Sequence, residues 1–218
     1  MLACTACQAT TTQPDRAQIE EAPLEECLDP VELHCLAESL EALREEFNAH
    51  SDKPRLVSLL SPGSAPCELG SRAIRESVLE AYPDAELQAL VVWVDDVPGT
   101  GPELASQEAR ALDGPRVRQF HDRSQRAGRA FAERLLPTAV AFDVYLFYPP
   151  GALWEERPPH PAYWAHQRGR IEPEHFHPRE ELFAELHRSM GLLHQGNGVA
   201  SVRDQGVALA AEGAPSAP

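Results

Sequence analysis

The stretch PRLVSLLSPGSAPCELG, residues 54–70, decides the fold of this chain of 218 residues. Its first half is a short apolar run that ends at the turn residues SPG, 61–63, and this pattern predicts a buried strand. Ser64 follows, and serine is a favoured helix N-cap because its side-chain oxygen accepts a backbone N–H. A helical pattern then extends from about residue 65 to 82. The stretch therefore predicts a strand that turns through a tight corner into a helix.

The segments after this corner predict an α/β protein. A second apolar strand is expected over 86–94, and the order strand, helix, strand at this spacing indicates parallel strands joined by a right-handed crossover. The pattern over 106–136 predicts two helices with a break near LDGPR. The stretch AFDVYLFYPPGALWEE, 141–156, predicts a β-hairpin around its Pro-Pro-Gly, and PREELFAELHRSMGLL, 178–193, predicts a last helix.

The segment before the corner predicts an additional helix over 29–50. Asp29 is a good N-cap, Pro30 fits the first helical position, and apolar residues then recur every three or four positions. We expect residues 1–26 to form a flexible leader, residues 27–195 to form the domain, and residues 196–218 to form a disordered tail.

Composition excludes several classes of partner. The formal net charge is -15 and no run of Lys and Arg is present, which argues against nucleic acid and anionic membrane surfaces. No stretch has the roughly 20 apolar residues of a membrane-spanning helix. The start of the chain lacks a visible signal peptide, although LAC followed by a polar tract is typical of the end of a bacterial lipoprotein signal, in which Cys4 would carry the lipid. The expected location is the bacterial cytoplasm or, with a lipid on Cys4, the periplasm.

The order of elements and two of their motifs resemble the thioredoxin-like superfamily over roughly residues 54–192. In LVSLLSPGSAPCELG, Ser64 and Cys67 occupy the two positions of the family's CxxC motif. LLPTAVAFDVYLFYPPGALW is similar to the family's Ile-Pro-Thr segment and the hairpin after it, so Pro137 is the candidate for the cis-proline that faces the motif. The later segments also resemble an uncharacterised bacterial group of such proteins, in which cysteine or selenocysteine can stand at the position of Ser64.

The resemblance implies a thioredoxin-like fold, a mixed sheet flanked by helices, and thiol redox chemistry. A cysteine or selenocysteine at position 64 would attack a disulfide or a peroxide, Cys67 would resolve the intermediate, and Pro137 would position the substrate. The expected partner is a protein or small-molecule disulfide. With Ser64 in place, we expect no dithiol oxidoreductase turnover. Two interpretations of Ser64 stay open: it replaces a cysteine or selenocysteine, or it is only a helix cap before an ordinary buried thiol.

Two other functions remain possible from the sequence. The chain has five cysteines, an odd number, and the spacing of Cys4 and Cys7 suits a metal or a disulfide. Cys27 and Cys35 flank the start of the first expected helix, and they could close as a disulfide in an oxidising compartment or act as a resolving pair for position 64. A soft-metal protein would use these four thiols with His175 and His177, which at i and i+2 of an extended segment point the same way, to bind mercury, copper or zinc. The remaining alternative is an interaction module without chemistry.

Overall fold

β2 (Arg55–Leu60) lies inside a mixed sheet and carries the corner at its carboxyl end. The computed structural model describes residues 31, 33–36, 38–96, 101–169 and 171–196. Within these ranges the other strands are β1 (His34–Cys35), β3 (Gln88–Val94), β4 (Val117–Asp122), β5 (Val144–Tyr148) and β6 (Tyr163–His166). They are ordered β1-β4-β3-β2-β5-β6; β5 is antiparallel to both its neighbours, and the other pairs are parallel. The α/β class expected from the sequence is therefore confirmed.

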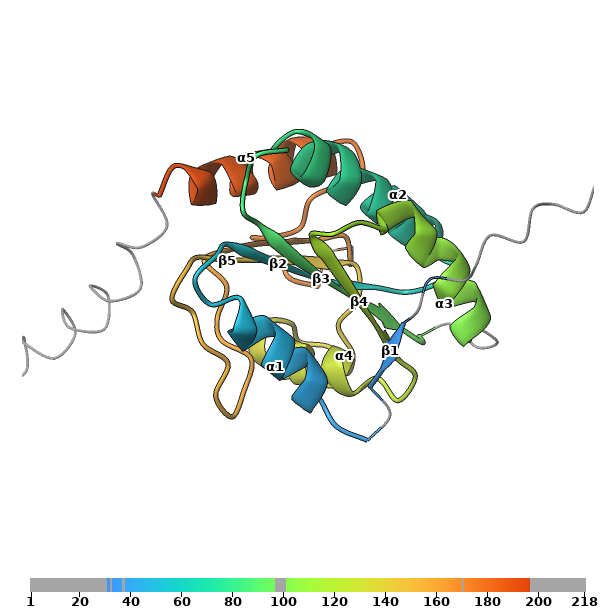
Figure 1. Ribbon diagram of the computed structural model, residues 1–218. Coiled ribbons are helices and arrows are strands. Elements are labelled where there is room, and N and C mark those ends of the chain that lie inside the picture. The colour runs from blue at the N-terminus through green and yellow to red at the C-terminus, as the bar shows by residue number, and fades with distance from the viewer. Residues whose placement is uncertain (1–30, 32, 37, 97–100, 170, 197–218) are drawn as a thin grey trace, which may run out of the picture.

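Helices cover both faces of this sheet. They are α1 (Glu41–Ala49), α2 (Ala65–Ile74), α3 (Pro102–Ala109), α4 (Arg126–Leu135) and α5 (Leu182–His194). α2 continues as a wider π-helical turn, Arg75–Glu80, and α3 continues as a 3₁₀ turn, Arg110–Leu112. Apolar side chains of α2, α3 and α5 form one buried cluster with the sheet, and those of α1 and α4 form another on the opposite face. Figure 1 shows these two layers on either side of the strands.

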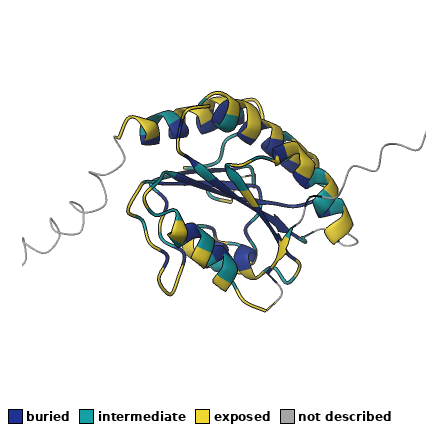
Figure 2. Ribbon diagram, viewed as in Figure 1, coloured by how far each residue is buried: buried dark blue, intermediate teal, exposed yellow. Residues whose placement is uncertain are grey.

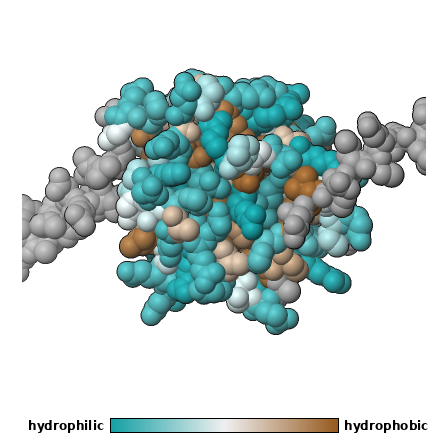
Figure 3. Space-filling view, viewed as in Figure 1, coloured by the Kyte–Doolittle hydropathy of each residue, from teal (hydrophilic) through white to brown (hydrophobic). Residues whose placement is uncertain are grey.

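Apolar residues form these two clusters, and most polar residues lie at the surface. The central strands are mostly dark blue in Figure 2, whereas the edge strand β1 and the outer sides of the helices are exposed. The face drawn in Figure 3 is mostly hydrophilic, with apolar side chains in small separate patches. Among the described residues, only Leu153 and Ile171 are large apolar side chains with high exposure.

The helix predicted over 29–50 is wrong in its first half. Residues 34–35 form a strand that pairs with the edge of β4, and helix α1 begins only at Glu41. Leu33 and Leu36 lie three apart, a spacing that places them together on a helix. In the extended chain they instead reach opposite faces of the sheet, where each joins a different apolar cluster. Asp29, the expected N-cap, lies outside the described residues, as do the leader and all but the first residue of the tail.

The prediction of two helices over 106–136 missed strand β4 between them. β4 is polar in sequence, VRQFHD, yet its last four residues are buried. Hydrogen bonds satisfy these polar groups: Gln119 accepts from the indole N–H of Trp93 and donates to the carbonyl of Ala109. Asp122 accepts the backbone N–H groups of residues 126, 127 and 128 at the start of α4. A strand whose polar groups are paired inside the protein has no alternating apolar pattern to reveal it.

The hairpin predicted over 141–156 is also wrong in its second strand. β5 forms as expected, but its antiparallel partner is β6, which begins at Tyr163 after a long connection. Buried Arg55 holds the start of this connection, because its guanidinium donates to the carbonyls of Pro149 and Ala152 at 2.6 and 2.8 Å. By contrast, the strands over 54–60 and 86–94, the helix after the corner and the last helix form essentially as predicted.

Candidate functional site

Ser64 begins α2 at the end of the tight turn after β2. Its backbone is extended, with φ of -97° and ψ of 133°, and its hydroxyl accepts the N–H of Cys67 at 3.2 Å. Gly63 precedes it with φ of 77°, a conformation that glycine adopts without steric cost. Ser64 is half-buried, so the N-cap predicted from the sequence is present and its side chain lies near the surface.

Cys67 lies inside the protein, one turn further along α2. Its side chain is 0% exposed. Its Sγ donates to Oδ1 of Asp143 at 2.6 Å and accepts the backbone N–H of Ser61 at 2.7 Å. Burial, followed by the negative charge of Asp143, raises the pKa of Cys67 far above that of a free thiol. Cys67 is therefore a protonated thiol at neutral pH, with a proton acceptor already in contact.

Asp143 is the residue that sequence reasoning missed. It precedes β5, and because Val144 pairs with Leu59 across the antiparallel ladder, Asp143 lies beside the end of β2. Its φ is 54°, which is uncommon for a residue other than glycine. It is only 4% exposed, and burial raises its pKa although Cys67 and Arg168 oppose the shift. A single aspartate before an apolar strand was the only signal in the sequence.

Pro137 does not take the place expected of it. The described residues contain no cis peptide bond, so the prediction of a cis-proline here is wrong. Pro137 is exposed and lies in the segment between α4 and β5. The side chain that reaches the thiol from this segment is Asp143.

A cavity of about 460 Å³ opens beside Ser64 between α2 and α3. The charged side chains that line it are both carboxylates, Glu68 and Glu108. Glu108 accepts the backbone N–H of Gly63 through Oε1 at 2.7 Å, and its buried Oε2 has no hydrogen-bond partner among the residues that the structure describes. Burial raises the pKa of Glu108. A molecule that approaches Ser64 through this cavity therefore passes the carboxylates of Glu68 and Glu108.

The described residues do not bring the predicted metal ligands together. Cys35 is exposed on β1, at one edge of the sheet, whereas His175 and His177 lie beside β6, at the other edge. Cys4, Cys7 and Cys27 lie outside the described residues.

The two histidines also have separate partners. His175 stacks on Trp164 with ring centroids 4.0 Å apart, and its Nδ1 lies 2.9 Å from a carboxylate oxygen of Glu172. His177 lies between Glu181 and Glu185, at 3.7 and 3.8 Å. His175 does form a loose group with Glu172 and Glu174, whose ligand atoms lie within 4.8 Å of one another. This group contains no thiol, which a soft-metal site would favour.

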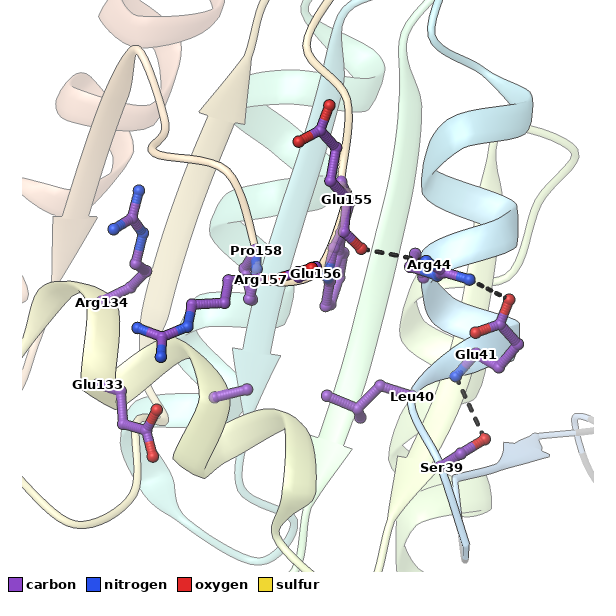
Figure 4. A pocket seen from close by; sticks show the side chains of 12 residues that line it. Ser39, Leu40, Glu41, Arg44, Glu133, Arg134, Glu155, Glu156, Arg157 and Pro158 are labelled. Atoms are coloured by element: carbon purple, nitrogen blue, oxygen red, sulfur yellow. Dashed lines mark hydrogen bonds and ion pairs between the residues drawn. The ribbon is translucent and has the colours of Figure 1, made fainter.

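A second cavity, of about 420 Å³, lies on the opposite face of the sheet, next to α1 and α4. Figure 4 shows its charged lining: Arg44 bonds to Glu41 and to the carbonyl of Glu155, while Arg134 and Arg157 extend on the other side. Its lining has charges of both signs and neither a thiol nor a histidine. The corner around Cys67 is therefore the candidate site.

Among the described residues, no helix is both long and apolar enough to cross a lipid bilayer. Comparison of the chain with protein-family models, with curated proteins and with solved structures gave no match.

Proposed function

We propose that this protein is a thioredoxin-like thiol redox protein whose reactive corner is residues 64–67. The observation that carries the proposal is the contact between Sγ of Cys67 and Oδ1 of Asp143, in which a buried thiol has a buried carboxylate 2.6 Å away. A structural cysteine needs no such partner, because a buried thiol packs as a small apolar side chain. A carboxylate placed to accept the thiol proton is what a resolving cysteine requires.

The arrangement of elements supports the same proposal. The corner follows β2, which has a parallel neighbour, β3, on one side and an antiparallel neighbour, β5, on the other. α2 starts at the corner, so its N-terminal N–H groups and helix dipole favour negative charge near position 64. This placement matches the resemblance between the sequence and the thioredoxin-like superfamily.

The chemistry takes place in two steps when position 64 carries a cysteine. Its thiolate attacks a substrate disulfide, forming a mixed disulfide and releasing one substrate thiolate. Cys67 then passes its proton to Asp143 while its Sγ attacks the sulfur at position 64, and the second substrate thiolate leaves. The substrate gains two electrons and the corner loses two, as a disulfide between 64 and 67. With Ser64, the first step has no attacking sulfur, so the chain lacks dithiol turnover.

The variant Ser64→Cys tests this proposal. We expect it to form a disulfide between positions 64 and 67 that is reversibly reduced by dithiothreitol, measured by differential alkylation and intact mass. Ser64→Ala and the double variant Ser64→Cys/Cys67→Ser are the matched controls, and neither should form this disulfide. If the oxidised Ser64→Cys protein keeps both thiols free, the proposal is wrong. The metal content of the same preparations separates it from the metal-binding alternative.

A further inference from the structure

Tyr145 on β5 has a buried hydroxyl that the redox proposal does not use. The side chain is 0% exposed, and its Oη has no hydrogen-bond partner among the described residues. Buried polar groups are almost always paired, because burying one without a partner costs free energy. An unpaired hydroxyl in the interior therefore needs an explanation.

The chain makes room for this hydroxyl next to the reactive corner. Gly70 follows Cys67 by one turn of α2, and a Cβ at position 70 would lie 2.1 Å from Oη of Tyr145. The hydroxyl thus lies against the backbone of α2 at Gly70, and any side chain at position 70 would displace it. Tyr145 and Cys67 also lie in the same buried cluster, on the face of the sheet that α2 covers.

The hydroxyl of Tyr145 keeps its proton at neutral pH and is therefore available as a donor. Burial, with added repulsion from Asp143 and Cys67, raises the pKa of Tyr145 well above its usual value, so the O–H keeps its proton. The other charged groups that interact with this site are Arg168 after β6, which opposes the raised pKa of Asp143, and Asp96 after β3, which adds to it.

We propose that Tyr145 is a positioning residue that donates a hydrogen bond to Sγ of Cys67 as the thiol proton moves to Asp143. This inference rests on the proposed redox function. In the resting thiol, Sγ accepts one hydrogen bond from the described residues, that of the N–H of Ser61. The proton transfer leaves a negative charge on Sγ, and a hydrogen bond from a second buried donor stabilises that charge. The hydroxyl is unpaired at rest because its partner is the thiolate.

Tyr145→Phe in the Ser64→Cys background removes only this oxygen. We expect closure of the disulfide between 64 and 67, started with oxidised glutathione, to slow about tenfold, the effect of losing one hydrogen bond to a charged group. The pH profile of closure should shift upward by about one unit for the same reason. Because the removed hydroxyl has no hydrogen-bond partner in the described part of the chain, the urea midpoint should not fall.

Tyr148→Phe is the matched control. Tyr148 lies on the same strand and is equally buried, but it packs in the cluster on the opposite face and its hydroxyl donates to the carbonyl of Pro159. Its closure rate and pH profile should equal those of Ser64→Cys alone. If Tyr145→Phe behaves in the same way, the inference is wrong and the redox function stands. If Ser64→Cys forms no disulfide at all, the redox proposal fails first, and the role of Tyr145 fails with it.

Discussion

At the scale of single residues, the corner brings a buried thiol, Cys67, into direct contact with a buried carboxylate, Asp143. Asp143 is buried, carries a raised pKa and adopts a left-handed backbone conformation. Each of these features costs stability, and such costs concentrate at functional sites. The hydrogen bond from Cys67 holds the carboxylate of Asp143 in place as the acceptor of the thiol proton.

Asp143→Asn tests that role. The raised pKa means that the folded protein holds the carboxyl proton more tightly than the unfolded chain, so the unfolding free energy falls as the pH rises from about 4, the usual aspartate pKa, through the folded value. Asn tolerates the positive φ and removes this dependence. We therefore expect Asp143→Asn to be more stable than the parent at pH 7, measured by urea unfolding.

The same substitution should disable the chemistry. In the Ser64→Cys background, loss of the proton acceptor should slow closure of the disulfide about a hundredfold, the usual contribution of a general base. Asp113→Asn, at an exposed site, serves as the control. A variant that is both less stable at pH 7 and unchanged in closure rate would contradict the assignment of Asp143.

At the scale of elements, β2 does more than carry the corner, because Arg55 at its start joins three segments. Its guanidinium is buried over the ring of Phe47 and donates to the carbonyls of Phe47, Pro149 and Ala152. One side chain thus fixes the end of α1 and the connection after β5 to the same strand.

Arg55→Lys should therefore destabilise the protein although the charge is kept. Lysine cannot reproduce the planar set of donors, and losing two hydrogen bonds from a charged group should lower the unfolding free energy by about 3 kcal/mol. The measurement is guanidinium-induced unfolding. Arg118→Lys, on the exposed side of β4, should change stability by less than about 0.5 kcal/mol. Equal effects from the two substitutions would show that the carbonyl contacts are unimportant.

β6 depends on a neutral histidine. Nδ1 of His166 accepts the N–H of Arg168 at 3.1 Å, so Nε2 carries the proton and donates to the carbonyl of Glu172 at 2.8 Å. Burial lowers the pKa of His166. The unfolded chain therefore binds the proton more readily, and stability decreases as the pH falls below about 6.5, the usual histidine value, through the folded pKa.

We expect acidification from pH 7 to pH 5 to lower the unfolding free energy of the parent relative to that of His166→Gln. Urea unfolding at both pH values measures this, and His160→Gln, in the exposed loop before β6, is the control. An identical pH dependence in His166→Gln and the parent would remove His166 as the titrating group.

At the scale of the whole molecule, the negative charge predicts which substrates the proposed reaction would favour. The net charge is -15, and Glu68 and Glu108 line the cavity beside Ser64, where the proposed reaction would begin. Negative potential raises the local concentration of cations and lowers that of anions.

The Ser64→Cys variant should accordingly react at least about tenfold faster with cystamine, a cationic disulfide, than with dithiodipropionate, an anionic one, at low salt. The ratio should decrease at higher ionic strength, because salt screens exposed charges. Glu108→Gln should also reduce it, whereas Glu103→Gln, on the exposed start of α3, should have less effect. A ratio near one at low salt would show that Glu68 and Glu108 do not influence the approach of the disulfide.

The sequence predicted those parts of the fold in which local pattern and tertiary environment agree. The apolar run of β2 and the Ser64 cap are local signals, and both are present as expected. β1 was missed because two leucines with helical spacing serve opposite faces of a sheet, and β4 because its polar groups are paired inside. The site was predicted only in half: Ser64 and Cys67 are neighbours in sequence, but Asp143 reaches Cys67 from 76 positions away. No local pattern encodes that contact.

The difference in burial between Cys35 and Cys67 determines what chemical proteomics would find. Electrophilic probes label cysteines according to their accessibility and thiolate content. In the folded protein such a probe would modify exposed Cys35, while Cys67, buried and protonated, would stay unlabelled. Of the two cysteines in the described residues, a survey that ranks thiols by probe reactivity would thus select the one at the edge of the sheet and overlook the one at the corner.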